Sequence, residues 1–420
     1  MSSLLIKSVR VINQTSEFHQ KVVDIFVDSG KISQIGKGLE ISADEVIQKE
    51  GLSVSVGWFD LRASLCEPGL EYKDTISTLC QSASFGGFTD VATLPNTQPI
   101  IQSKESIGFV KQQSQLHTTD LHPIVAFTKE VEGKQLTEML DLHHAGAVAF
   151  SDGTKPLQNE GILTLGLQYL QTVDGLLMVT PEVESIAPNG QMHEGISSTL
   201  LGMKGLPALS EELAIIRSLE LLKYTGGKIH FSNISTARSV ELIREAKKQD
   251  LRVSCDICAH QVYFTDSDMM AFDTLRKVKP PFRTEKDNEA IWEGLLDNTI
   301  DVITSSHSPH DQESKQLEFD LADFGILGLE TAFATINSKR PKNFPIEKLI
   351  EKFTTNPRQI LKLSQPKIAV GEMSKLTLFD ENYCWVFSKS DIKSKSKNTP
   401  FIGEMFVGKA FGIVNGEKSY

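Results

Sequence analysis

The sequence has neither a long apolar run nor an excess of basic residues. Its 43 lysines and arginines are outnumbered by 54 aspartates and glutamates, which gives a formal net charge of -11 at pH 7. No stretch reaches the roughly 18 apolar residues that a membrane-spanning helix needs. An acidic chain repels the phosphates of nucleic acids and of anionic membranes. We therefore expect no membrane span, no membrane-surface partner and no nucleic-acid partner.

Cysteine and secretion signals are also scarce. The chain has five cysteines, an odd number, and its first stretch, MSSLLIKSVRVINQTSEF, lacks the apolar core and cleavage site of a signal peptide. These features predict a cytoplasmic protein with free thiols. Cys255 and Cys258 form a CxxC pair inside the apolar run VSCDIC, with no second such pair in the chain. This context favours two core cysteines over a zinc or redox site.

What the sequence does contain is a repeating strand and helix pattern. The stretch 56–100 predicts a buried strand that reaches Asp60 and ends near Arg62 and Ser64, a helix from about Lys73 to Ser84, and a second strand over 89–94. Similar apolar strands and amphipathic helices alternate up to about residue 362. Alternation of this kind is typical of a parallel α/β barrel, in which chemistry lies where strands end and loops begin.

Both ends of the chain are instead rich in strands. Asp28-Ser29-Gly30 and Asn415-Gly416 are hairpin turn signals between apolar stretches. We expect residues 1–56 and 363–420 to form a small β-sandwich domain beside a barrel at 57–362. The Lys- and Ser-rich stretch Phe387–Pro400 is expected to be an exposed loop.

Three motifs carry a resemblance to a known family. Glu67-Pro68-Gly69, Gly86-Gly87-Phe88-Thr89 and Pro95-Asn96-Thr97-Gln98-Pro99 resemble those of the dihydroorotases, which belong to the cyclic amidohydrolase superfamily. The resemblance covers almost the whole chain. It implies a distorted (β/α)8 TIM barrel of the amidohydrolase type and, in the family, zinc-dependent opening of a cyclic amide.

The metal-binding positions implied by this resemblance hold other residues. In the family they are histidines and carboxylates, which bind zinc and lower the pKa of a bridging water. Here the corresponding positions are Arg62, Ser64, Gly153, Thr180, Asn233 and Ser306. Arg62 also places a fixed positive charge where a dication would lie. We therefore predict no catalytic residue, no zinc and no other cofactor.

The substrate contacts implied by the family are altered too. Cys66 stands where the family has an arginine that grips the substrate carboxylate, and Lys279 stands where it has an asparagine. Asn96 and His310 remain as remnants. If a metal were bound, the candidate ligands would be Asp60, Asp152, His260 and His307. A structural role for His307 and His310 in their loop is the favoured interpretation, because a metal site needs several convergent ligands.

These observations leave three hypotheses for function. The leading one is a non-catalytic dihydroorotase-like protein of pyrimidine biosynthesis, a structural or regulatory partner of aspartate carbamoyltransferase by family resemblance, and a homodimer or larger assembly. The second is an active zinc-dependent dihydroorotase or related cyclic amidohydrolase with an atypical site. The third is a sensor of an anionic pyrimidine metabolite, with Arg62, Lys279 and Asn233 lining its pocket.

Overall fold

The computed structural model describes residues 3–420 and is dominated by a barrel of parallel strands. Its eight strands are β6 (Trp58–Ser64), β7 (Phe88–Leu94), β8 (Asp120–Val125), β9 (Ala149–Phe150), β10 (Leu177–Val179), β13 (Ile229–Phe231), β14 (Val253–Cys258) and β15 (Val302–Thr304). They pair in chain order from β6 to β15. The barrel closes just beyond β15, where the Ser64 amide donates to the His307 carbonyl at 2.8 Å. The predicted α/β barrel is confirmed.

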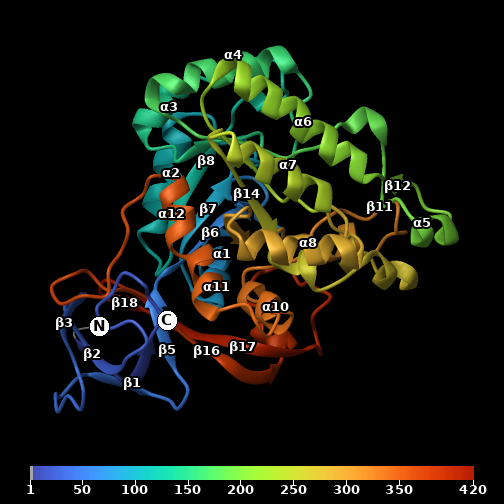
Figure 1. The fold of residues 1–420 in the computed structure, drawn as a ribbon. Helices are drawn as coiled ribbons and strands as arrows, with labels where there is room; N and C mark the ends of the chain where they lie inside the picture. Colours follow the sequence, from blue (N-terminus) through green and yellow to red (C-terminus); the bar gives the residue numbers. More distant parts are fainter. Residues whose placement is uncertain (1–2) are drawn as a thin grey trace.

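Helices surround this barrel, as Figure 1 shows. They are α1 (Ile76–Gly86), α2 (Lys104–Ser114), α3 (Met139–Ala145), α4 (Glu160–Leu170), α5 (Ile196–Leu201), α6 (Ala208–Thr225), α7 (Ala237–Lys248), α8 (Glu285–Leu296), α9 (Gln312–Lys315), α10 (Ala332–Ser338), α11 (Ile346–Phe353) and α12 (Thr355–Ile360). Helix α1 begins three residues after the predicted Lys73, because Thr75 caps it by accepting from the Thr78 amide. A short parallel pair, β11 (Met192–His193) and β12 (Gly205–Leu206), flanks α5.

Strands from both ends of the chain form a second sheet. It contains β1 (Ser3–Val11), β2 (Val22–Asp28), β3 (Lys31–Gly36), β4 (Glu45–Gln48), β5 (Ser53–Val56), β16 (Lys375–Val386), β17 (Met405–Asn415) and β18 (Lys418–Ser419). The antiparallel pairing of β5 with β16 joins the two ends. Both predicted hairpins are present, β2 with β3 and β17 with β18. The chain ends therefore meet beside the barrel (Figure 1).

An aromatic cluster ties this sheet to the barrel. Trp58 at the start of β6 is fully buried, and its ring centroid lies 5.4 Å from that of Phe379 on β16 and 4.8 Å from that of Phe333 on α10. Its indole nitrogen donates to Ser55 Oγ at 2.9 Å. Contacts of this kind between large rings stabilise a core beyond the area they bury. The sheet thus fixes the amino end of β6, the strand that carries Arg62.

The expectation that Phe387–Pro400 is exposed is wrong, although the segment is a loop. Side chains alternate along this segment: Ser394, Ser396 and Asn398 are buried, whereas Lys395 and Lys397 are exposed. The buried members find hydrogen-bond partners on the barrel, for example Ser396 Oγ on the Lys73 carbonyl at 2.6 Å. A composition typical of solvated loops therefore conceals an extended segment with one polar face turned inward.

The five cysteines are free, and four of them are buried. Cys255 and Cys258 both lie on β14, in agreement with their interpretation as core residues. Within residues 3–420, no helix combines the length and apolar character required to cross a bilayer.

Candidate functional site

A cavity of about 370 Å³ opens at the carboxyl ends of the barrel strands. Among the residues singled out by sequence, its lining contains Arg62, Ser64, Cys66, Asn96, Thr180, Asn233, His260, Lys279, Ser306, His307 and His310. Asp60, Asp152 and Gly153 are outside that lining. The structure therefore brings almost all the predicted positions to one place, because successive strand ends of a parallel barrel meet at one rim.

Arg62 lines this cavity and is only 4 % exposed. Its Nη2 donates to the Gly153 carbonyl at 3.3 Å and to Thr180 Oγ1 at 3.4 Å. Its Nη1 has no hydrogen-bond partner. Burial lowers the pKa of the guanidinium, although Asp256, Cys258 and Asp60 oppose that shift from a distance. The side chain is thus a buried cation that joins the ends of several strands without an ion-pair partner among the described residues.

Asn233 connects Arg62 to a buried carboxylate. With its amide oriented so that both ends are satisfied, the Asn233 oxygen accepts from Arg62 Nε and from Ser306 Oγ, each at 3.1 Å, and its nitrogen donates to Asp256 Oδ1 at 3.1 Å. Asp256 also accepts from His230 Nε2 at 2.8 Å and is fully buried. Sequence reasoning missed Asp256 and His230. The available signal was an aspartate inside the apolar run VSCDIC.

The position of Gly153 has no room for a carboxylate side chain. A Cβ there would lie 1.7 Å from Asn96 Oδ1, and φ at Gly153 is +65°. Asn96 is held in that place because its Nδ2 donates to the Asp152 carbonyl at 3.1 Å and its Oδ1 accepts from the Thr154 amide at 3.2 Å. A longer side chain at position 153 would have to displace this asparagine.

Two of the candidate metal ligands are carboxylates, and both accept hydrogen bonds from residues outside the cavity. Asp152 accepts from the Thr128 amide at 2.8 Å and from Thr128 Oγ1 at 2.6 Å, and burial raises its pKa. Asp60 accepts from the Ser305 amide at 2.7 Å and from Ser305 Oγ at 2.6 Å. Burial raises the pKa of Asp60 to about 7, with these hydrogen bonds acting in the opposite direction. Neither carboxylate lines the cavity.

His307 has partners on both ring nitrogens. Its Nδ1 accepts from the backbone amides of Gly328 and Leu329 at 3.2 and 3.3 Å, which assigns the proton to Nε2. Nε2 faces Asp74 Oδ2 at 3.5 Å. The ring therefore links two segments of the barrel rim, and it lacks the free nitrogen lone pair that a metal ligand needs.

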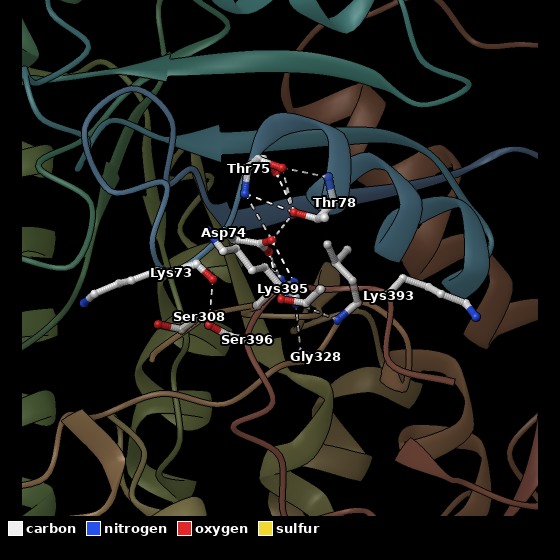
Figure 2. A network of polar contacts seen from close by, with 12 residues as sticks. Lys73, Asp74, Thr75, Thr78, Ser308, Gly328, Lys393, Lys395 and Ser396 are labelled. Carbon is white, nitrogen blue, oxygen red and sulfur yellow. Dashed lines mark hydrogen bonds and ion pairs between the residues drawn. The ribbon is translucent and has the colours of Figure 1, made fainter. Parts of the chain in front are cut away.

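Asp74 is the centre of the polar network in Figure 2. It accepts from the Thr75 amide at 3.1 Å, from Ser394 Oγ at 2.9 Å and from the Lys395 amide at 3.1 Å. Figure 2 shows this carboxylate between the start of α1 and the segment that carries Lys393 to Ser396. The network holds that segment against the loop that leads from β6 to α1.

The other two histidines of the lining differ from each other. His260 is 5 % exposed, its Nδ1 has no hydrogen-bond partner, and burial lowers its pKa to about 3. His310 Nδ1 lies 3.1 Å from Asp323 Oδ2 and 3.3 Å from Lys73 Nζ. Burial and the nearby Lys73 charge lower the pKa of His310 to about 4, despite Asp323. Both rings are thus neutral near pH 7.

Neither Cys66 nor Lys279, which stand at the positions of the family's substrate contacts, offers an unpaired positive charge. Burial raises the pKa of the Cys66 thiol to about 12, so this residue is neutral and cannot form the bidentate pair that an arginine would. Lys279 Nζ lies 2.9 Å from Glu182 Oε1, so its charge is already paired. No local sequence pattern indicates this pairing.

These residues do not fit a zinc centre. The five predicted positions in the cavity lining present one guanidinium, one amide and three hydroxyls, whereas zinc in proteins takes thiolate, imidazole and carboxylate ligands. Across the part of the chain that the structure describes, no three His, Cys, Asp or Glu side chains come together in an arrangement able to hold a metal ion. Asp60 and His307 are linked only through Ser305, whose hydroxyl donates to Asp60 and accepts from the His307 backbone amide, whereas Asp152 is bonded to Thr128.

Comparison with known proteins agrees with the motifs. The Dihydro-orotase-like family model matches residues 53–239. The chain is 38% identical over 417 residues to a dihydroorotase of Acetivibrio thermocellus, covering 98% of both chains. It is 36% identical to a dihydroorotase of Pelotomaculum thermopropionicum, covering 98% of this chain and 97% of that relative.

Solved structures show the same fold. An L-hydantoinase (dihydropyrimidinase) from Arthrobacter aurescens superposes with a TM-score of 0.86 over 100% of this chain and 96% of its own, at 23% identity. A D-hydantoinase superposes with a TM-score of 0.81 over 99% of this chain and 95% of its own, at 19% identity. Identity of more than one third to curated relatives along almost the entire length means that this chain belongs to the dihydroorotase family.

Proposed function

We propose that this chain is a non-hydrolytic dihydroorotase-like protein, which acts in pyrimidine biosynthesis as a structural or regulatory partner. The observation that carries the proposal is the place of Arg62, whose guanidinium contacts the ends of neighbouring strands where the family positions its metal. A dication placed about 4 Å from this charge would be repelled by several kcal/mol even at an effective dielectric constant of about 20.

A second observation supports the loss of hydrolysis. The general acid and base of the family corresponds to Ser306, whose hydroxyl donates to the Asn233 amide oxygen at 3.1 Å. A serine hydroxyl has no accessible pKa near neutrality and cannot exchange a proton with a water nucleophile in the manner of a carboxylate. The site thus lacks both the means to generate hydroxide and the group to shuttle its proton.

The alternative is an active zinc-dependent dihydroorotase with an atypical site. The names of the curated relatives favour it, because they are called dihydroorotases and match along the whole chain. This alternative requires ligands from outside the family positions. Two of the remaining candidates are engaged elsewhere: His307 with Gly328 and Asp74, and Asp152 with Thr128. His260 has an unpartnered Nδ1, but among the described residues it belongs to no group of three side chains able to hold a metal ion.

The first experiment is elemental analysis of the full chain, purified without chelator or affinity tag, with a dihydroorotate assay on the same sample. We expect zinc far below one ion per chain and no ring opening above background. Stoichiometric zinc together with turnover would overturn the proposal and favour the alternative.

A reversion variant provides the matched control. This variant restores five family ligands. It carries histidine at four positions and aspartate at one: Arg62→His, Ser64→His, Thr180→His, Asn233→His and Ser306→Asp. We expect this variant to bind more zinc than the unchanged chain, with incomplete loading because position 153 remains glycine. Equal zinc content in the two proteins would contradict our assignment of these positions.

The partner is proposed from family resemblance to be aspartate carbamoyltransferase. We expect the two proteins to co-purify, and we expect carbamoyltransferase activity to fall when this chain is removed. A carbamoyltransferase that assembles and works fully without the chain would contradict the partner assignment while leaving the loss of hydrolysis untouched. A homodimer or larger assembly and a cytoplasmic location stay predictions.

A further inference from the structure

Four lysines gather where β17 and the segment that precedes it meet α1: Lys389, Lys393, Lys397 and Lys409. We call them the lysine cluster. The Nζ atoms of Lys393 and Lys409 lie 4.9 and 5.5 Å from the centroid of the Phe85 ring on α1. Burial lowers the pKa of Lys397, and the charges of Lys389 and Lys393 act in the same direction. The four ammonium groups therefore share one surface, and they repel one another.

The lysine cluster has no ion pair within residues 3–420. The carboxylates whose charge reaches it are Asp74 and Glu330, near Lys397, and Asp391, near Lys409. All three accept hydrogen bonds from other donors, which are the Lys395 amide for Asp74, the Lys393 amide for Glu330 and the Ser388 hydroxyl for Asp391. Asp74 and Glu330 are also buried. The positive charge of the cluster is thus left for a partner outside the chain.

The backbone beneath the cluster is held in place from the inside. Glu330 Oε1 accepts from the amides of Lys393 and Ser394 at 3.2 and 3.1 Å, and Asp74 Oδ1 accepts from the Lys395 amide at 3.1 Å. Figure 2 shows the Lys393 side chain extending away from the network around Asp74. Because the segment is already ordered, a partner that binds here does not bear the entropy cost of fixing its backbone.

The ammonium groups keep free donors. Lys393 Nζ uses one bond, to the Ser390 carbonyl at 3.1 Å, and Lys397 Nζ uses two, to the carbonyls of Ile392 and Ser394 at 3.3 and 2.7 Å. An ammonium group has three donors. Lys409 Nζ lies over the Trp385 ring, 4.1 Å from its centroid. Lys395 is not part of the cluster, because its Nζ reaches the Glu71 carbonyl instead.

Exposed apolar side chains adjoin the cluster. Val386 on β16 and Met405 on β17 are opposite each other in the ladder, and they are 52 and 67 % exposed. Val386 lies three residues before Lys389 in the chain. The rest of the molecule is acidic, with a formal net charge of -11 for the whole chain. A long polyanion that reached beyond the cluster would therefore be repelled, whereas a short segment with both carboxylates and apolar groups finds complementary contacts.

We propose that the lysine cluster, together with Val386 and Met405, is a docking surface for an acidic segment of a partner protein in which carboxylates alternate with apolar side chains. The inference rests on the partner role in the proposed function and adds the chemistry of the contact. Recognition uses side chains, because the backbone amides of Lys393, Ser394 and Lys395 already donate inward and cannot pair with an added strand. None of the four lysines lines the cavity.

Binding is tested with the full-length chain by fluorescence anisotropy. The probe is a labelled synthetic peptide in which glutamate and leucine alternate. The controls are the same peptide with glutamine in place of glutamate and a single-stranded oligothymidylate of equal charge. At about 50 mM salt we expect the acidic peptide to bind at least about 10-fold more tightly than either control, and its affinity to fall as salt is raised. No binding of the acidic peptide, or equal binding of the oligonucleotide, would overturn the inference.

Variants locate the surface. The test variant removes three charges of the cluster and keeps Lys409, which packs on Trp385: Lys389→Gln, Lys393→Gln and Lys397→Gln. The control variant makes the same change of charge at exposed lysines elsewhere: Lys37→Gln, Lys286→Gln and Lys367→Gln. We expect the test variant to weaken the acidic peptide about 10-fold and the control less than about 2-fold, given the usual strength of exposed ion pairs. Equal affinities of the two variants would contradict the assignment.

A smaller variant covers the case in which the test variant does not fold. Lys389→Gln with Lys397→Gln changes only fully exposed lysines and should weaken the peptide by about 3-fold. Sedimentation velocity on the same proteins separates a partner from a second copy of this chain. A change of oligomeric state confined to the cluster variants would assign the surface to contacts between copies and overturn the partner.

The two proposals fail in different ways. Stoichiometric zinc with turnover defeats the proposed function and leaves binding of the acidic peptide as a separate result. A zinc-free chain that does not bind the acidic peptide defeats the docking surface alone. A zinc-free chain that binds the peptide through the lysine cluster supports both.

Discussion

Arg358 at the amino end of the barrel and Arg62 at its carboxyl end are both buried, and they have different partners. At the amino end, Arg358 is 2 % exposed and its Nη2 lies 2.6 Å from Asp90 Oδ2. Asp90 also receives Lys375 Nζ and His122 Nε2, each at 2.8 Å. At the carboxyl end, Arg62 is 4 % exposed and contacts a carbonyl, a hydroxyl and an amide.

The paired charges around Asp90 stabilise the fold at the amino end of the barrel. Burial raises the pKa of Asp90, but Arg358, His122 and Lys375 outweigh burial and hold it well below the usual range. This cluster joins β7, β8, α12 and β16, elements that come from distant parts of the chain. In an α/β barrel the amino end serves stability, whereas the carboxyl end serves ligands. The unpaired cation at the carboxyl end fits that division.

The largest effect is expected at the amino end. Arg358→Met should lower the free energy of unfolding by about 3–5 kcal/mol, because it leaves Asp90 buried without its closest cation. Urea unfolding at pH 7 measures the loss. If Arg62→Met costs as much as Arg358→Met, the contrast between the two ends is wrong.

A pH-dependent effect should follow at the carboxyl end. Burial lowers the pKa of His260 from its usual value of 6.5 to about 3. As pH falls from 6.5 towards 3, His260 is protonated in the unfolded chain but stays neutral in the folded chain. The free energy of unfolding therefore decreases over this pH range. His260→Gln should reduce this loss by about 2–3 kcal/mol at pH 4.5 relative to pH 7.5.

Urea midpoints of the wild type and of His260→Gln at both pH values measure this effect. His144→Gln, at an exposed position on α3, is the matched control. A pH dependence of His260→Gln that parallels that of the wild type would show that the His260 ring is not buried in a neutral form.

A smaller effect is expected for the segment beside the rim. Ser394→Ala removes the bond from Ser394 Oγ to Asp74 and should cost about 1 kcal/mol of unfolding free energy. The control is Ser390→Ala, which removes an exposed hydroxyl bonded to Ser388 and should cost less than about 0.5 kcal/mol. Equal costs would mean that the inward face of this segment contributes nothing.

The smallest effect is expected for Arg62 itself. Arg62→Met removes a buried cation that has no carboxylate partner and replaces it with an apolar side chain of similar length. The free energy of unfolding without ligand should change by less than about 1 kcal/mol, in either direction. A large loss would show that the bonds to Gly153 and Thr180 are stronger than their lengths suggest.

Local patterns were enough to predict much of the fold. The apolar strand ending at Arg62 and Ser64 and the hairpin at Asp28-Ser29-Gly30 are both present. These features depend on neighbours in sequence, which a period or a turn residue reveals. The segment 393–398 was mispredicted because its burial depends on Asp74, more than 300 residues away.

The site was predictable in position but not in contacts. Family motifs placed Arg62, Thr180 and Asn233 together, and the cavity lining includes all three. The pairing of Lys279 with Glu182 could not be predicted, because it depends on two loops from different parts of the barrel. The Asp74 partner of His307 lies 233 residues away in the chain, so no local pattern indicates it.

The segment between β16 and β17 limits where the chain can be truncated. It leaves the terminal sheet, crosses to the barrel rim and returns, and on the way Asn398 donates to the carbonyls of Ser308 and Gly325 and accepts from the His310 amide. Those three residues line the cavity. Cutting the chain after residue 362 would therefore remove the brace of the barrel mouth along with the sheet. A segment between two strands of the terminal sheet thus forms part of the barrel rim, so we expect the barrel to be less stable without the sheet.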